Sequence, residues 1–201
     1  MTYTGWIILT AALVGVSCGI IGVFLILRKM AMMSDAISHT VLLGIVLAYL
    51  VTRELYGVHM LIGAIMAGLL TAVLVQWLNN RGVQQDASIG VVFTTLFAIA
   101  VIIIATSLGN VHLDVQHSLM GEITFIPWNT MTLPWLGDVP KATALLGLVL
   151  LIVLFFIILF YKEWKITTFD PALAASLGIP VVFMHYLFMT LVSITTVASF
   201  D

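Results

Sequence analysis

Long, unbroken apolar stretches constrain this chain more than any motif does. A helix needs roughly 20 apolar residues to cross a bilayer. Six stretches reach or nearly reach that length, and they lack the alternating hydrophobicity of a membrane β-barrel. They cover residues 6–27, 33–51, 58–78, 88–108, 142–161 and 181 to the end. We therefore predict an all-α, polytopic transmembrane helical bundle with about six spans.

Composition supports a membrane protein and argues against other classes. Of the 201 residues, 62% are hydrophobic and 8% are charged, whereas soluble domains are about 45–50% apolar and about 25% charged. The net charge of −2 and the lack of a basic stripe argue against a nucleic-acid partner. A single cysteine, Cys18, excludes a disulfide framework within the chain. We expect membrane lipid as the surroundings and one transmembrane domain over residues 1–201.

The basic residues predict how the spans are oriented. By the positive-inside rule, the side with more Lys and Arg faces the cytoplasm. This places the N-terminus outside and makes residues 108–140, which contain three prolines, an external segment. The last span then heads outward and stops at Asp201, so we expect a C-terminally truncated chain. The seven basic residues divide into Arg28, Lys29, Arg81, Lys162 and Lys165 on one side, and Arg53 and Lys141 on the other.

An ionisable pair stands at the head of the second apolar stretch. Asp35 and His39 are four residues apart, so both side chains lie on one face of a helix. Ionisable groups within a span are costly and by default functional. A carboxylate and an imidazole suit Mn²⁺, Fe²⁺ or Zn²⁺, and two copies about a two-fold axis would complete the shell. The alternative is an Asp–His hydrogen bond that pins the helix start, with Ser34 or Asp35 as its N-cap.

A second informative segment, KEWKITTFDPALAASLGIP, covers residues 162–180 between the fifth and sixth stretches. Asp170 followed by Pro171 is typical of a helix start, and Gly178 is typical of a helix end. We predict a short helix over Ala172–Leu177 on the cytoplasmic side. Its role is either to dock a partner or to connect two spans at the membrane interface.

Other polar residues follow less specific patterns. Asp86 and Ser88 stand at the start of the fourth stretch, where helix capping accounts for them. The motif HLDVQH contains His112, Asp114 and His117. These residues either guide metal entry or are ordinary exposed side chains, and the sequence leaves both interpretations open.

Small residues recur at helical spacing in two of the apolar stretches. Gly15 is paired with Gly19, and Ala64 with Gly68. Such pairs let neighbouring helices approach closely, and ordinary packing within the bundle accounts for them.

Four segments taken in order resemble one family. They are LRKMAMMSDAISHTVLLGIVLAYL, ASIGVVFTTLFAIAVIII, HLDVQHSLMGEI and FDPALAASLGIP. Together they resemble the membrane permeases of manganese, zinc and iron uptake ABC transporters of the ABC-3 type, from about residue 10 to the end. The resemblance implies a type II ABC importer-like fold in the bacterial plasma membrane. It also implies that Asp35 and His39 contact the transported metal, manganese first and zinc or iron next, with no permanently bound cofactor.

The resemblance also implies a set of partners. These are a second permease, identical or different, two cytoplasmic ATPase subunits and an external metal-binding lipoprotein. The chain lacks a G-x-x-x-x-G-K-[ST] loop, so ATP would be bound and hydrolysed by the partner ATPase. The resemblance assigns docking on this ATPase to a coupling segment made of Phe169, Asp170, Pro171, Ala172, Leu173, Ala174, Ala175, Ser176, Leu177 and Gly178.

Two other classes of membrane protein would also have this many apolar spans. In a proton-coupled secondary carrier or a redox-complex membrane subunit, Asp35 would relay protons. An intramembrane enzyme is disfavoured because H-E-x-x-H does not occur and no serine sits in a G-x-S-x-G elbow, since the one match, at residues 15–19, lies inside the first apolar stretch. We therefore expect a transporter permease that carries out no catalysis itself.

Overall fold

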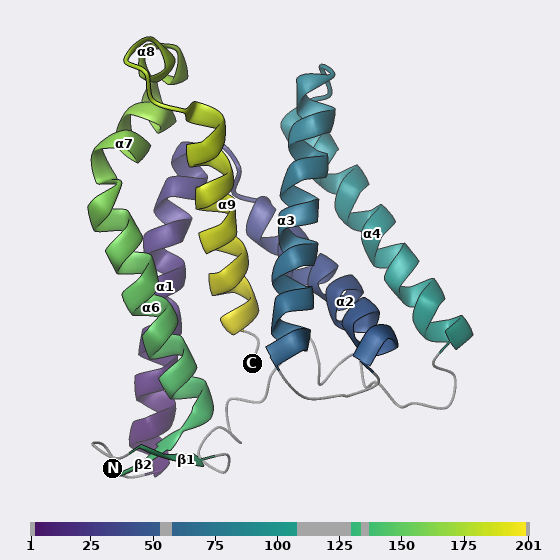
Figure 1. The fold of residues 1–201 in the computed structure, drawn as a ribbon, viewed down its shortest axis with the longest axis vertical. Helices are drawn as coiled ribbons and strands as arrows, with labels where there is room; N and C mark the ends of the chain where they lie inside the picture. The colour runs from purple at the N-terminus through teal and green to yellow at the C-terminus, as the bar shows by residue number, and fades with distance from the viewer. Residues whose placement is uncertain (1–2, 53–57, 108–129, 134–136, 200–201) are drawn as a thin grey trace.

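The computed structural model describes residues 3–52, 58–107, 130–133 and 137–199 (Figure 1). Within these ranges six helices are long and apolar enough to cross a membrane, which confirms the predicted all-α bundle and its number of spans. They are α1 (Tyr3–Leu27), α2 (Met33–Thr52), α3 (Val58–Asn80), α4 (Gln85–Ser107), α6 (Lys141–Leu159) and α9 (Val181–Ala198).

Shorter elements link the last two spans and precede α6. Helices α7 (Tyr161–Phe169) and α8 (Pro171–Ser176) connect α6 to α9. The predicted short helix at Ala172–Leu177 is therefore confirmed as α8, one residue earlier, whereas α7 was not predicted. A two-stranded antiparallel hairpin, β1 (Thr130–Leu133) and β2 (Gly137–Pro140), leads directly into α6. It was also missed, because the prolines of this segment indicated only an irregular structure.

The spans form two groups that α9 joins (Figure 1). Helix α2 packs mainly on α3 and α4, whereas α1 packs on α6. Helix α9 contacts α1, α2, α3 and α6. The short helix α8 and the turn between α3 and α4 lie at one end of the bundle, and the hairpin and the start of α1 lie at the other (Figure 1). This arrangement agrees with the alternating directions expected of consecutive spans.

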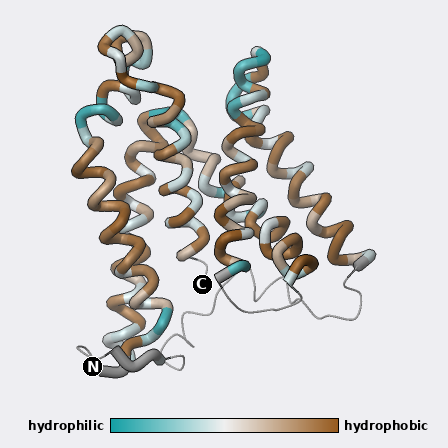
Figure 2. The backbone as a smooth tube through the Cα atoms, viewed as in Figure 1, coloured by the Kyte–Doolittle hydropathy of each residue, from teal (hydrophilic) through white to brown (hydrophobic). Residues whose placement is uncertain are grey.

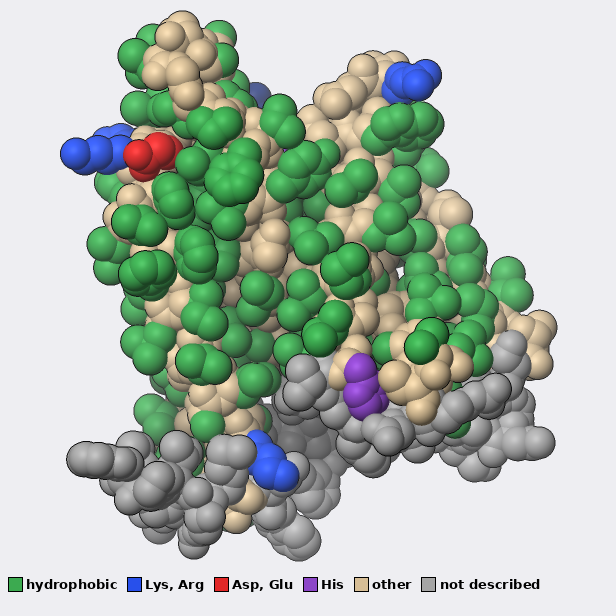
Figure 3. Space-filling view, viewed as in Figure 1, with side chains coloured by type: hydrophobic (Ala, Val, Ile, Leu, Met, Phe, Trp, Pro, Cys, Tyr) green, Lys and Arg blue, Asp and Glu red, His purple; other side chains and the backbone are tan. Residues whose placement is uncertain are grey.

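Much of the surface is apolar, as expected for helices that face lipid. The backbone is hydrophobic along most of each span and more hydrophilic at the turns (Figure 2). Hydrophobic side chains cover the middle of the visible face, with Lys and Arg towards its ends (Figure 3). On α6, for example, Leu151, Phe155 and Ile158 are all exposed. A helix that is apolar all round needs an apolar solvent, so the described structure is that of a multi-pass membrane protein.

A close backbone contact joins α2 to α3 through two glycines. A Cβ atom added to Gly44 would overlap the carbonyl oxygen of Gly63, and one added to Gly63 would lie 2.6 Å from the carbonyl oxygen of Gly44. The backbones therefore touch at a point where no side chain fits. Of the pairs noted in the sequence, Ala64 lies at this contact, whereas Gly68 faces Ser193 of α9 and Ile37 of α2, and both are buried. A Cβ atom at Gly15 or Gly19 would meet nothing within 4 Å.

Replacing Gly44 with alanine should destabilise the packing of α2 on α3. The new methyl group would push the backbones apart, and overpacking of this kind costs about 1–3 kcal/mol. We expect Gly44→Ala to lower the melting temperature of the detergent-solubilised protein. The control is Gly147→Ala on α6, where nothing lies within 4 Å of the added atom. Equal melting temperatures for the two variants would contradict the proposed backbone contact.

Candidate functional site

The start of α2 exposes the ionisable pair because its other face is tightly packed. A turn follows α1 and includes Lys29 at a φ of 59°. Helix α2 then begins at Met33, and Met33, Ile37 and Thr40 are fully buried. The opposite face of this first part of the helix therefore carries Asp35 and His39 outward.

Asp35 and His39 face each other on this exposed side of α2. The Nε2 atom of His39 lies 3.7 Å from Oδ1 of Asp35, and the side chains are 42% and 61% exposed, respectively. This separation exceeds hydrogen-bond length, so the described geometry does not contain the Asp–His hydrogen bond considered as an alternative. Both groups remain able to bind a third atom.

The predicted N-cap role of Ser34 or Asp35 does not match the start of α2. The helix begins at Met33, so both residues lie inside its first turn. The hydroxyl of Ser34 instead lies 3.3 Å from that of Thr196 on α9. This hydrogen bond ties the start of α2 to α9.

Two aromatic rings from α4 border the imidazole of His39. The ring of Phe93 is stacked on it, with centroids 5.7 Å apart and planes at 27°. The ring of Phe97 approaches at 5.8 Å and 72°, edge to face. The imidazole thus has an aromatic wall on one side and Asp35 on another.

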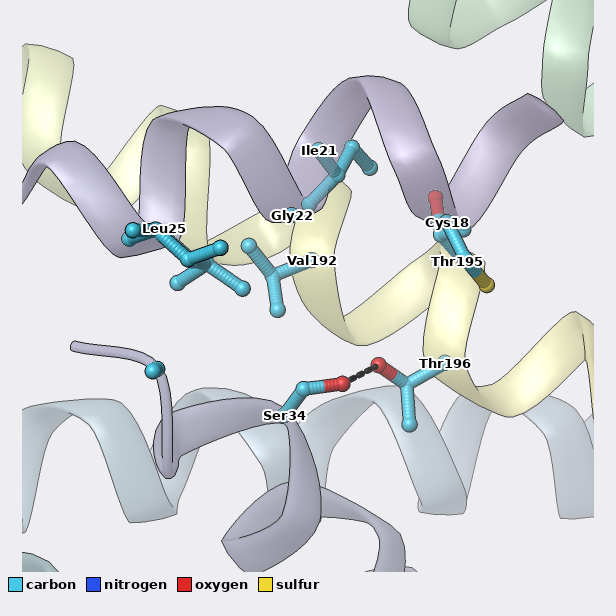
Figure 4. Close-up of a pocket in the computed structure, with 10 residues that line it drawn as sticks. Cys18, Ile21, Gly22, Leu25, Ser34, Val192, Thr195 and Thr196 are labelled. Carbon is cyan, nitrogen blue, oxygen red and sulfur yellow. Dashed lines mark hydrogen bonds between the residues drawn. The ribbon is translucent and has the colours of Figure 1, made fainter. Parts of the chain in front are cut away.

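A small cavity adjoins the start of α2. It measures about 190 Å³ and lies between α1, the turn before α2 and α9 (Figure 4). Apolar side chains such as Ile21 and Val192 form much of its lining, and the hydrogen-bonded Ser34 and Thr196 lie at one side (Figure 4). Thr195 also lines it, and the Oγ1 of this residue is buried with no hydrogen-bond partner in the structure as described.

The pair offers only part of a metal coordination shell. Among the described residues there is no group of three or more His, Cys, Asp or Glu side chains that could hold a metal ion. Two ligands leave at least two positions open around a tetrahedral ion and more around an octahedral one. The pair therefore needs ligands from elsewhere to hold a metal.

At the other site predicted from sequence, α7 is anchored in the bundle by a buried tryptophan. Trp164 is fully buried, and its Nε1 donates a hydrogen bond to the carbonyl of Met184 on α9 at 3.2 Å. Its ring packs edge to face against Phe188 of α9 and Phe24 of α1. Helix α7 is thereby attached to both spans.

Arg28 strengthens this attachment at the end of α1. Its guanidinium donates to the hydroxyls of Thr168 at 3.1 Å and Thr167 at 3.3 Å, and it lies 4.7 Å from the ring centre of Phe188. Burial lowers the pKa of Arg28 to about 10, which leaves it charged at neutral pH. From the sequence, Arg28 predicts only which side of the membrane faces the cytoplasm. No pattern around it indicates that Thr167 and Thr168 accept its hydrogen bonds.

Helix α8 has the predicted cap and presents an apolar surface. The backbone N–H of Leu173 donates to Oδ1 of Asp170 at 2.9 Å, and Gly178 ends the segment at a φ of 81°. Ala174 is fully buried. Most of the predicted coupling segment is exposed: Phe169, Asp170, Pro171, Ala172, Leu173, Ala175, Ser176, Leu177 and Gly178.

A cleft of about 430 Å³ opens between α7 and α8. Its walls are mainly apolar and include Ile166, Phe169 and Leu173, with Lys162 and Lys165 also lining it. This end of the bundle therefore combines a rigid attachment to the spans with an uncovered apolar surface.

The family follows from comparison of the whole sequence. Residues 1–201 match the ABC 3 transport family. The chain belongs to this family. The resemblance predicted from the four sequence segments is confirmed.

Relatives of this ABC 3 family member are named as metal transport proteins. The manganese transport system membrane protein MntD of Bacillus subtilis is 59% identical over 201 residues, which are 100% of this chain and 68% of the relative. The zinc transport system membrane protein TroD of Treponema pallidum is 42% identical over 196 residues, 97% of this chain and 53% of the relative. The chain thus spans about half to two thirds of the length of these relatives.

A solved structure has a similar fold. It is described as PsaBC from Streptococcus pneumoniae in complex with Fab, and the match has a TM-score of 0.74 at 30% identity. The match covers 100% of this chain and 66% of that chain. The fold of this chain is therefore similar to that of a solved membrane protein.

The remaining predicted polar residues of the family member have structural roles or lie elsewhere. Asp86 is in the first turn of α4. Ser88 is buried, and its hydroxyl donates a hydrogen bond to the carbonyl of Gln84 at 3.1 Å. The predicted capping role of Ser88 is therefore wrong, because a cap would accept a hydrogen bond from a backbone N–H. His112, Asp114 and His117 lie outside the described residues, so the hypothesis of a metal-entry role stays a prediction.

The cap of α8 can be tested by substitution at Asp170. Removal of an N-cap side chain costs about 0.5–2 kcal/mol, and a six-residue helix has little other stabilisation. We expect Asp170→Ala to speed amide hydrogen exchange over residues 171–178, whereas Asp170→Asn keeps the acceptor and slows exchange back towards the original. Equal exchange in both variants would show that the capping bond does not hold α8.

Proposed function

We propose that this chain is the permease part of an ATP-driven importer of divalent transition metal ions, manganese first and zinc or iron next. The observation that carries the proposal is the exposed Asp35 and His39 pair in the first part of a membrane span. An ionisable pair is costly at such a place unless it faces a partner or a water-filled path.

A second permease supplies the missing ligands in this proposal. Two copies of the pair about a two-fold axis give two carboxylates and two imidazoles, a set suited to Mn²⁺, Fe²⁺ and Zn²⁺. The second permease is either identical or different. The exposure of the α2 face in a single chain supports this arrangement, because contact with a second permease would cover the charges.

The chemistry of transport requires ligands that replace water and then release the ion. Removing a divalent ion from water is expensive, and oxygen and nitrogen ligands offset that cost. Binding must be weak enough for exit. A site divided between two subunits meets both needs, since separating the halves removes half of the ligands.

The names of the relatives support the metal and the class of transporter. They include manganese and zinc transport proteins, and membership of an ABC transport family favours ATP over a proton gradient as the energy source. The proton-relay interpretation of Asp35 is therefore the weaker one. A separate subunit would bind ATP, and an external lipoprotein would deliver the metal to the side that holds the N-terminus.

The segment from Phe169 to Gly178 is proposed to dock on the ATPase. Phe169 and Leu177 are 68% and 61% exposed and flank α8, which lies at one end of the bundle (Figure 1), where apolar surface favours a protein partner. Trp164 and Arg28 tie α7 to α1 and α9, and α1 leads through a short turn to α2. A push on α8 would therefore reach the helix that carries Asp35.

The metal site is tested by removing one ligand at a time. We expect Asp35→Ala and His39→Ala each to lower manganese uptake by about tenfold or more, since even 1.4 kcal/mol of lost binding gives a factor of ten. Uptake is measured with radioactive manganese in cells and normalised to the amount of permease in the membrane. Ser38→Ala, in the same turn, is the control and should transport normally. Normal uptake by either ligand variant would overturn the site.

Docking is tested with a charge on the exposed side of α8. Ala175→Glu buries an unpaired carboxylate if the ATPase covers this face, so we expect loss of copurifying ATPase and of uptake. The control is Ala87→Glu, an exposed residue at the start of α4, where negative charge at a helix N-terminus is tolerated. A fully coupled Ala175→Glu transporter would show that α8 does not dock the ATPase.

A further inference from the structure

Two phenylalanines of α4 border the imidazole of His39, and the proposed function gives them no role. Phe93 is stacked on the ring at 27°, and Phe97 meets it edge to face at 72°. Spaced four residues apart, they lie on one face of α4. Together with the 3.7 Å contact to Asp35, they border the imidazole on more than one side.

The rest of α4 is held firmly against the bundle. Its buried stripe consists of residues at helical spacing, namely Ile89, Val92, Leu96 and Ala100. Phe93 and Phe97 each follow a stripe residue and are only partly buried. They therefore lie at the edge of a fixed helix, beside the exposed pair.

The shape of the contact indicates more than filling of space. A leucine would supply similar apolar volume, but only a flat ring offers a face on which an imidazole stacks. Without the rings, the His39 side chain, 42% exposed, would be free to adopt other rotamers. The imidazole nitrogen would then spend less time beside the Asp35 carboxylate.

We propose that Phe93, assisted by Phe97, is a positioning residue that fixes the His39 imidazole and thereby sets the selectivity of the site. The inference rests on the proposed metal site at Asp35 and His39. Zinc gains more from an imidazole ligand than manganese, which suits carboxylate and water. Loosening the imidazole should therefore weaken zinc binding more than manganese binding.

The test compares the two metals in the assembled permease–ATPase complex, without the external lipoprotein. Binding of radioactive manganese to the purified complex gives its dissociation constant, and competition by added Zn²⁺ gives the zinc inhibition constant. For both Phe93→Ala and Phe93→Leu we expect the zinc inhibition constant to rise about tenfold, which corresponds to about 1.4 kcal/mol. The manganese constant should rise only about two- to threefold. Phe93→Tyr keeps the flat ring and should retain both constants. Phe97→Leu should change both in the same direction but less.

Controls separate a positioning role from a packing role. Phe155→Ala removes a lipid-exposed ring on α6 and should leave the ratio of the two constants unchanged. Phe93→Leu keeps most of the apolar volume, so it decides the question if Phe93→Ala is scarce in the membrane. An unchanged ratio in Phe93→Leu, or a Phe93→Tyr that behaves like it, would overturn the proposal.

Failure of this inference differs from failure of the metal site. If His39→Gln lowers uptake while Phe93→Leu changes neither constant, the site stands and the positioning role is wrong. If His39→Gln leaves both manganese uptake and zinc inhibition unchanged, the metal site itself is wrong and the inference falls with it.

Discussion

The packing of α2 against its neighbours determines what the rest of the molecule can do. Met33 and Ile37 are fully buried, and further along the helix Gly44 meets Gly63 of α3 backbone to backbone. These contacts fix the rotation of α2 about its own axis. Because four residues make slightly more than one turn, that rotation places Asp35 and His39 together on the uncovered side. Packing energy supplied by apolar side chains thus holds two polar ones in place.

Much of the fold follows from the sequence, because the bilayer limits what apolar runs can form. Continuous hydrophobicity over about 20 residues leaves few alternatives to a spanning helix, and the predicted ranges agree with the six helices to within a few residues. The cap at Asp170 was predictable for a similar reason, since an Asp-Pro pair has a local meaning that tertiary structure rarely changes. The start of α4 was harder to predict, because the Ser88 hydroxyl donates a hydrogen bond to the preceding turn and does not cap the helix.

Contacts between distant residues were not predictable. Nothing in the sequence near Arg28 indicates that Thr167 and Thr168 accept its hydrogen bonds, since the partners lie about 140 positions away. The two phenylalanines beside His39 belong to an apolar run in which any large residue satisfies the pattern. Gly15 and Gly19 show the converse, because their helical spacing predicts a close approach that α1 does not make with the described helices. Periodicity identifies a face, whereas the choice of neighbour depends on the whole bundle.

The partners of Arg28 have a consequence for movement. In the described structure this cation is held by two neutral hydroxyls and the face of an aromatic ring. A carboxylate in their place would bind more strongly and would leave a buried, unpaired negative charge whenever the two groups separated. Hydroxyls on successive residues of α7 avoid that second charge, and either can keep a hydrogen bond to Arg28 if the other separates. A small shift between α1 and α7 would therefore leave no carboxylate without a partner beside the cation.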